Sequence, residues 1–254
     1  MTNIVVLIKQ VPDTYSERKL SDGDYTLDRE AADAVLDEIN EKAVEEALQI
    51  KEAAGGEVTV LAAGPARTTD AIRKALSMGA DKAIHILDDA MHGSDAIQTS
   101  WVLARALGTV EGVELVIAGN EATDGRVGAV PAIIAEYLEL PHLTHLRKLT
   151  GERETDDGIF HLESSLPAIV SVGEKINEPR FPSFKGIMAA KKKEVQVLSL
   201  ADIGVEPEEV GLANAGSTVT TSTPKPAKTA GEKVVDEGDG GTKVAEYLVG
   251  QKII

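Results

Sequence analysis

The sequence predicts an α/β fold with a doubly wound, mostly parallel sheet, to which a β-hairpin and an extended C-terminal arm are added. Short, nearly continuous apolar runs alternate with stretches of helical periodicity, and such runs are typical of parallel strands buried on both faces. The alternation later stops, and a stretch rich in Ala, Thr, Ser and Pro precedes the C-terminus. A chain of 254 residues can form one large core with appendages.

Four apolar runs are expected to form strands, and the stretches that separate them are expected to be helices. The strands are Asn3–Ile8, Glu57–Ala62, Ala83–Leu87 and Glu114–Ala118. The helices are Asn40–Ala54, Thr68–Met78, Asp95–Leu107 and, after the fourth strand, about Val130 to Leu138. A regular order of strand and helix builds a sheet with helices on both faces.

A β-hairpin is expected where the alternation stops. Leu146–Leu149 and Ile159–Ser164 flank a segment, Thr150–Gly158, whose Gly, Asp and Thr residues favour a turn. Leu166–Val172 is expected to be a further strand.

The C-terminal part is expected to be an arm that wraps another chain. The composition of Ala213–Gly241 cannot bury enough apolar surface to fold alone. Thr242–Leu248 has apolar residues at helical spacing, but so short a helix needs a surface on which to dock. We therefore expect a domain over residues 1–195 and an arm with a short terminal helix over residues 196–254.

The composition excludes several classes of function. The chain has no cysteine, which rules out disulfides, thiolate catalysis and cysteine-ligated metal sites built from this chain. A formal net charge of −16 is unfavourable for an extended nucleic-acid footprint. No apolar run reaches the roughly 20 residues of a membrane span, and the N-terminus lacks a signal-peptide pattern. A cytoplasmic protein without membrane insertion or nucleic-acid binding is expected.

No catalytic or metal-binding residue is predicted. The five histidines are scattered and lack the i, i+4 spacing of a helical metal pair, so structural or surface positions are expected for them. The sequence contains no evident Ser, His and Asp cluster for nucleophilic catalysis. Because the chain has no cysteine, any redox role needs a cofactor that the chain does not itself supply.

Three loops at the carboxyl ends of predicted strands have the chemistry of a ligand site. In doubly wound sheets, ligands bind beyond these ends, near the switch in strand order. The loop after the fourth strand is the most informative, because Gly119, Gly125 and Gly128 permit close backbone approach just before a helix N-terminus. Arg126 could donate to a phosphate there, whereas Asp124 fits a turn cap or a ribose contact better. Glycines at such positions often serve only to form a turn, so a structural turn and a phosphate site both stay open as interpretations.

Four segments together resemble the β subunits of electron-transfer flavoproteins. They are Val5–Thr14, Asn40–Ala47, Ala75–His85 and, above all, the run from Asn177-Glu178-Pro179-Arg180-Phe181 to Ile187-Met188-Ala189-Ala190-Lys191-Lys192-Lys193. The similarity runs from the first strand to about Val195 and resumes weakly in the C-terminal helix.

The resemblance implies a heterodimer in which an α subunit holds the redox-active FAD and the β subunit binds a structural AMP. By family position, the AMP site is expected after the first and second strands, before the first helix and in the glycine-containing loop. Its residues would be Leu7, Lys9, Asp37, Glu38, Ile39, Asn40, Ala63, Gly64, Gly119, Asn120, Asp124, Gly125, Arg126, Val127, Gly128, Ala129 and Val130.

The chain departs from the family pattern in two places at this site. Many relatives have Asn-Pro-Phe/Tyr-Asp where this chain has Asp37–Asn40, so Ile39 replaces aromatic or proline packing. The family loop commonly continues with Asp-Thr-Ala-Gln, whereas Arg126–Ala129 follows here. We predict that Arg126 compensates for the lost donors at the phosphate.

The resemblance also implies that residues 177–193 form a recognition loop, which docks a partner dehydrogenase by inserting one apolar side chain. Phe184 lies at that position, and a desolvated aromatic side chain can act as a hot spot. The expected partner-binding residues are Glu178, Pro179, Arg180, Phe184, Ile187 and Met188. The alternative is that Phe181 and Phe184 pack in their own core.

The implied function is electron transport by a carrier subunit rather than a catalyst. The FAD of the heterodimer would take electrons from acyl-CoA or similar dehydrogenases, as in fatty acid β-oxidation, and deliver them to a membrane quinone oxidoreductase. One alternative is an electron-bifurcating form with a second FAD in place of AMP. Another is a stand-alone ATP-binding protein resembling universal stress proteins, which share this HUP-type sheet.

Overall fold

The chain forms two compact units, Met1–Thr220 and Thr221–Ile254. The structure is a computed structural model that describes residues 2–227, 230–231 and 233–254. The first unit extends beyond the boundary expected at residue 195, because the next residues add an edge strand to the sheet and bury Leu200, Ile203 and Val205 in the core. The boundary between the two compact units falls at Thr220.

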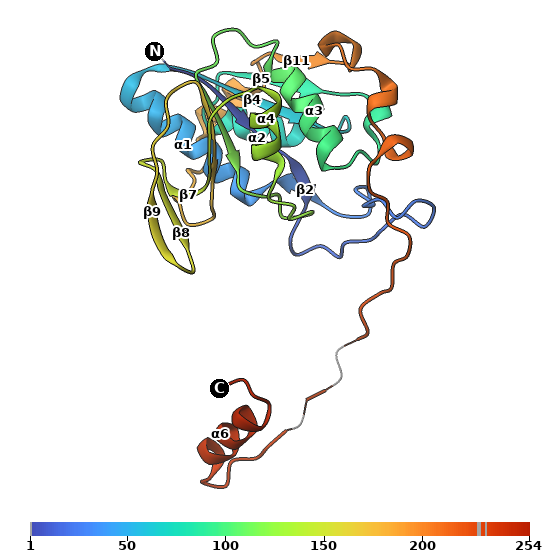
Figure 1. Cartoon of the computed structure of the whole chain (residues 1–254), viewed down its shortest axis with the longest axis vertical. Coiled ribbons are helices and arrows are strands. Elements are labelled where there is room, and N and C mark those ends of the chain that lie inside the picture. The colour runs from blue at the N-terminus through green and yellow to red at the C-terminus, as the bar shows by residue number, and fades with distance from the viewer. Residues whose placement is uncertain (1, 228–229, 232) are drawn as a thin grey trace. The chain divides into compact units, whose positions relative to one another are not determined.

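A nine-stranded sheet lies at the centre of the first unit (Figure 1), in the order β11-β5-β4-β1-β6-β10-β7-β8-β9. Strands β11 to β7 run parallel, and β8 and β9 are antiparallel. The strands are β1 (Thr2–Leu7), β4 (Gly56–Ala63), β5 (Lys82–Ile86), β6 (Leu115–Gly119), β7 (His142–Lys148), β8 (Glu152–Thr155), β9 (Gly158–His161), β10 (Ala168–Val172) and β11 (Val195–Leu198). The predicted α/β doubly wound fold is confirmed.

Helices on the two faces of the sheet enclose two separate apolar cores. In β1, Ile4 and Val6 belong to one core and Val5 and Leu7 to the other, because successive side chains of a strand point to opposite faces. This explains the continuous apolar runs. The first core contains residues of α1 (Glu38–Ala54) and α2 (Thr68–Met78), and the second contains residues of α3 (Ala96–Leu107) and α4 (Val130–Tyr137).

The hairpin differs from its prediction. Part of the segment expected to be a turn, Thr150–Gly158, forms strand β8, which pairs with β7 on one side and β9 on the other. The turns lie instead around Gly151, at φ +90°, and between β8 and β9. Strand β8, Glu152–Thr155, has no buried residue, so it lacks the apolar alternation that identifies a strand in a sequence.

Several short elements gave no sequence signal. Strands β2 (Gln10–Pro12) and β3 (Ala34–Leu36) form an antiparallel ribbon that closes a long excursion of residues 13–33. Helix α5 (Phe184–Ala190) lies inside the recognition loop. The remaining short turns are 3-10 helices: η1 (Asp89–Met91), η2 (Ala201–Ile203), η3 (Pro207–Glu209) and η4 (Leu212–Asn214).

The second unit contains helix α6 (Gly240–Gly250), and its described residues before this helix form no other helix or strand. The short terminal helix is close to its predicted position. Val244, Tyr247 and Val249 are exposed on it, which leaves this apolar surface uncovered within the described residues. None of the described helices has the length and apolar character needed to cross a membrane.

Candidate functional site

A cavity of about 580 Å³ lies at the carboxyl ends of β1, β4 and β6. The chain passes from β1 to β4 and β5 on one side and later to β6 on the other, so the cavity lies at the switch in strand order. Nine of the residues predicted for the AMP site line it: Leu7, Lys9, Asn40, Ala63, Gly119, Asn120, Val127, Gly128 and Val130. The loops chosen from the sequence do meet at one cavity, while their role in nucleotide binding stays a prediction.

A second wall of the cavity was not predicted. It comes from the segment that starts α3 and from the base of the C-terminal arm, and includes Ser94, Asp95, Ala96, Thr99, Leu103 and Ser217. The cavity is completed by Ile8, Ala118, Glu121, Ala122 and Pro131. Asp95 caps α3 and also accepts a hydrogen bond from the Gly216 N–H at 2.8 Å, which fixes the last residues of the first unit beside the cavity. No local motif marks such a long-range contact.

The remaining predicted residues do not line the cavity. They are Asp37, Glu38, Ile39, Gly64, Asp124, Gly125, Arg126 and Ala129. Several of them hold its walls in place instead. Gly64, for example, lies with its carbonyl oxygen 3.0 Å from Nε2 of His85, a buried structural histidine, and burial lowers the pKa of that imidazole.

Asp37 joins the first helix to the glycine-containing loop. Its Oδ1 accepts hydrogen bonds from the N–H groups of Ile39 (3.0 Å) and Asn40 (3.2 Å), which caps α1. Its Oδ2 accepts hydrogen bonds from the N–H (2.7 Å) and the hydroxyl (2.9 Å) of Thr123. Asp37 is completely buried, and these four hydrogen bonds hold α1 and the loop together.

Asp124 holds two cations at the edge of the cavity. Its side chain is only 2% exposed, and its oxygens lie 2.8 Å from Nζ of Lys9 and 3.1 Å from Nη2 of Arg29. Burial alone would raise the pKa of this carboxyl, but the charges and hydrogen bonds of Lys9 and Arg29 outweigh burial and keep the pKa below its usual value. Asp124 thus acts as an ionised anchor for Lys9, which lines the cavity.

Arg126 lies in a different environment from the one predicted. Its Nη1 is 2.6 Å from Oε1 of Glu121, and its side chain is 60% exposed. Its φ of +50° places it in the left-handed region at the turn of the loop. A phosphate contact would require the guanidinium to exchange or share its Glu121 partner, so this role stays a prediction.

The lining of the cavity suits an adenine nucleotide. Leu7, Ala63, Leu103 and Pro131 provide apolar surface for a flat base. Asn120 Oδ1 is buried without a hydrogen-bond partner among the described residues, and an N–H or O–H group of a ligand could satisfy it. The first turn of α4 has no side-chain cap, which leaves helix N–H groups for an anion.

The structure answers the question left open for the two phenylalanines of the recognition loop. Phe181 is 94% exposed and Phe184 is 81% exposed, so the alternative that they pack in their own core is wrong. Phe184 begins α5, which Ser183 caps by accepting a hydrogen bond from the Gly186 N–H at 3.0 Å. Ile187 and Met188 are also exposed on this helix. Glu178 and Pro179 precede it in an irregular stretch.

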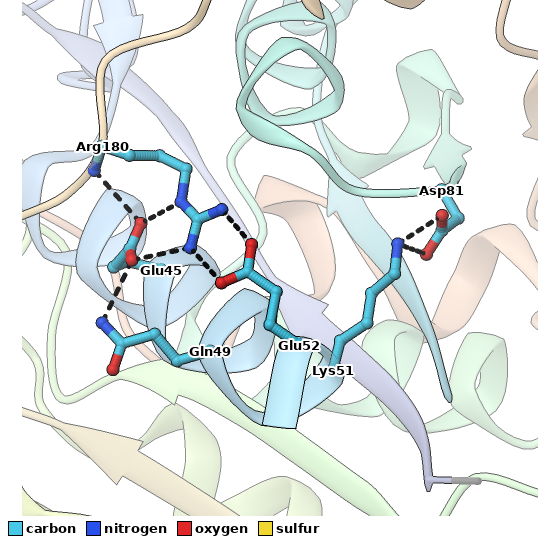
Figure 2. Close-up of polar contacts among 6 residues, drawn as sticks. All are labelled: Glu45, Gln49, Lys51, Glu52, Asp81 and Arg180. Atoms are coloured by element: carbon cyan, nitrogen blue, oxygen red, sulfur yellow. Dashed lines mark hydrogen bonds and ion pairs between the residues drawn. The ribbon is translucent and has the colours of Figure 1, made fainter. Parts of the chain in front are cut away.

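Arg180, predicted to contact a partner, is bound to the first helix of its own chain (Figure 2). Its guanidinium donates hydrogen bonds to the carboxylates of Glu45 and Glu52. Burial would raise the pKa of Glu45, but the hydrogen bonds from Arg180 and Gln49 keep that pKa below its usual value. The hydrogen bonds to the Glu45 and Glu52 carboxylates in turn raise the pKa of Arg180.

Within the part of the chain that the structure describes, no group of three or more His, Asp or Glu side chains is arranged to hold a metal ion.

Comparison with known proteins agrees with the resemblance seen in the sequence. The family model described as Electron transfer flavoprotein domain matches residues 24–203. The Electron transfer flavoprotein subunit beta of Mycobacterium tuberculosis is 77% identical over 100% of both chains. The protein of that name from Thermoanaerobacterium thermosaccharolyticum is 39% identical over 91% of each chain. The Caffeyl-CoA reductase-Etf complex subunit CarD of Acetobacterium woodii is 36% identical over 97% of this chain and 96% of its own. The chain therefore belongs to the electron transfer flavoprotein family, as a β subunit.

Proposed function

We propose that this β subunit holds AMP as a structural nucleotide and docks acyl-CoA or similar dehydrogenases through Phe184. In this proposal, the FAD of an α subunit accepts electrons from the docked dehydrogenase and passes them to a membrane quinone oxidoreductase. The C-terminal arm wraps the α subunit, and the complex works in the cytoplasm. The flavin supplies the electron-carrying chemistry, whereas this chain supplies binding and orientation.

The observation that carries the docking proposal is the exposure of Phe184 at the start of a capped helix. An aromatic side chain that is 81% exposed has most of its surface available for burial by a partner. In the heterodimer, Phe184→Ala is expected to raise the KM for transfer from an acyl-CoA dehydrogenase by roughly tenfold or more, in line with the loss of a hot-spot contact. FAD content should stay unchanged.

Phe160 provides a matched control, because it is also exposed but lies on strand β9, away from the recognition loop in sequence. Phe160→Ala is expected to leave the KM within about twofold, since a single exposed side chain outside a hot spot contributes little to binding. An unchanged KM for Phe184→Ala would refute the docking role.

Nucleotide analysis tests the other half of the proposal. The purified heterodimer should release one FAD and one AMP, and release of two FAD would instead support the electron-bifurcating form. Absence of any adenine nucleotide other than a single FAD would refute a nucleotide role for the cavity. In the same measurement, Arg126→Ala should lower AMP retention, and unchanged retention would count against its phosphate role.

A further inference from the structure

The recognition loop is fixed to the body of the protein at both ends. At its C-terminal end, Arg73 of α2 donates hydrogen bonds to the carbonyl oxygens of Ala190 (2.7 Å) and Lys193 (2.6 Å). At its N-terminal end, Asn177 Nδ2 donates to Lys42 O (3.0 Å) and Lys42 Nζ donates to Asn177 O (2.7 Å). The exposed apolar side chains of the loop lie between these two attachments.

Arg180 makes the most extensive contact at the N-terminal end. Its Nε and Nη2 lie 2.7 Å and 3.0 Å from the two carboxylate oxygens of Glu45, and its own N–H donates to Glu45 Oε2 at 3.1 Å. Nη2 also lies 3.1 Å from Oε2 of Glu52. A planar guanidinium bound by two carboxylates holds both the position and the orientation of its segment.

The backbone around Arg180 depends on these contacts. Residues 174–183 contain no helix or strand, so no ladder of backbone hydrogen bonds fixes their conformation. Phe181, the next residue, is almost fully exposed and offers no packing to hold the segment. The side chain of Arg180 therefore fixes a stretch that leads directly into Phe184.

We propose that Arg180 is a positioning residue for interprotein electron transfer, which holds the recognition loop on α1 through Glu45 and Glu52 and so presents Phe184 to the partner in one orientation. This inference rests on the proposed docking function. It assigns Arg180 to the scaffold of the docking surface, although the sequence resemblance had placed it among the contact residues. Without the contacts of Arg180 with Glu45 and Glu52, the loop would sample several conformations, and only a fraction of molecules would be competent to dock.

The test measures electron transfer from an acyl-CoA dehydrogenase to the intact heterodimer. It compares kcat and the KM of the dehydrogenase for the heterodimer. Arg180→Gln should raise the KM roughly tenfold, because the entropy of fixing even one backbone residue changes an equilibrium by about this factor. The kcat at saturation and the FAD content should stay unchanged. Arg180→Lys should recover only part of the affinity, since an ammonium cannot bind both carboxylates in the same fork geometry.

The ion pair between Lys51 of α1 and Asp81 provides a matched control. Lys51 Nζ lies 2.6 Å from Asp81 Oδ1, the pair is drawn beside the Arg180 cluster in Figure 2, and among the described residues neither side chain forms a hydrogen bond with the recognition loop. Lys51→Gln should leave the KM within about twofold, as expected for a partly exposed pair. Hydrogen exchange should increase in residues 177–188 of Arg180→Gln and stay unchanged in Lys51→Gln.

Arg180→Gln leaves the buried Glu45 carboxylate without its partner, which could cause misfolding. A second variant distinguishes misfolding from the loss of positioning. The double variant Glu45→Gln, Arg180→Gln has no lone buried charge and should show the same increase in KM. A KM within twofold of the wild type for the double variant, measured together with an increased KM for Phe184→Ala, would overturn the positioning role alone. An unchanged KM for Phe184→Ala would instead overturn the docking function on which it rests.

Discussion

Replacing Asp37 with alanine should destabilise the domain and loosen the cavity that is proposed to bind the nucleotide. Loss of the cap on α1 costs about 1 kcal/mol. The Thr123 N–H and hydroxyl then lose their common acceptor, and an unsatisfied buried group costs about 1–3 kcal/mol. With two such groups, the combined loss is roughly 3–7 kcal/mol, a large part of the 5–15 kcal/mol by which typical proteins are stable.

The assay is thermal unfolding of the heterodimer together with analysis of its bound nucleotide. For a unit of this size, 1 kcal/mol shifts Tm by about 2–4 °C, so Asp37→Ala should lower Tm by roughly 10 °C. Asp37→Asn should lower Tm by less than Asp37→Ala, because asparagine also caps helices well but presents an amide donor on one side. The amount of nucleotide retained after purification should be lowest for Asp37→Ala and intermediate for Asp37→Asn.

Asp28 offers a control, because its Oδ1 also accepts two backbone hydrogen bonds, from Glu30 and Ala31 at 3.1 Å, but at an exposed turn. Water can replace Asp28 there, and Asp28→Ala should lower Tm by no more than about 2 °C. An equal Tm for Asp37→Ala and Asp28→Ala would refute the reasoning, since Asp37 differs from Asp28 in its burial and in the two additional hydrogen bonds that it accepts from Thr123.

Three further changes probe separate parts of the fold. Gly186→Ala would place a Cβ 2.4 Å from the carbonyl oxygen of Ser77, so α5 should move away from α2 and dehydrogenase docking should weaken. Docking as strong as that of the wild type would contradict the close approach of α5 to Ser77. Asp124 has a pKa below its usual value of 3.8, so its stabilising effect is complete above that pH and is lost as the pH falls through the lower folded-state pKa. Asp124→Asn should therefore be less stable than the wild type to urea at pH 7, and the difference in stability should narrow as the pH falls below 3.8; a constant difference would argue against an ionised anchor. Gly56 has a φ of +133°, and an added Cβ would lie 2.1 Å from backbone, so Gly56→Ala should lower the free energy of unfolding by more than about 1 kcal/mol. Gly23→Ala, with open space around the added Cβ, should leave the free energy of unfolding nearly unchanged in the same urea titration.

The recognition loop shows where a family resemblance is informative and where it is incomplete. The motif identified the segment and predicted Phe184 as the side chain that contacts a partner. It did not separate Phe184, which is exposed, from Arg180, whose charge is bound by the chain's own α1. Residues that contact a partner and residues that hold the contacting segment occur together in a motif, and only their neighbours in space distinguish them.

The sequence by itself determined the sheet, its main helices and the loops that meet at the cavity, because apolar periodicity and glycine positions are local properties of the chain. It missed β8, which buries no residue, and the edge strand β11, which is short and half exposed. Only the tertiary structure decided which polar groups bind one another. Asp37 and Thr123 are 86 positions apart, and Arg180 and Glu45 are 135 positions apart. Such pairs leave no periodic pattern, because hydrogen bonds between distant segments depend on how the helices and loops pack once the sheet has formed.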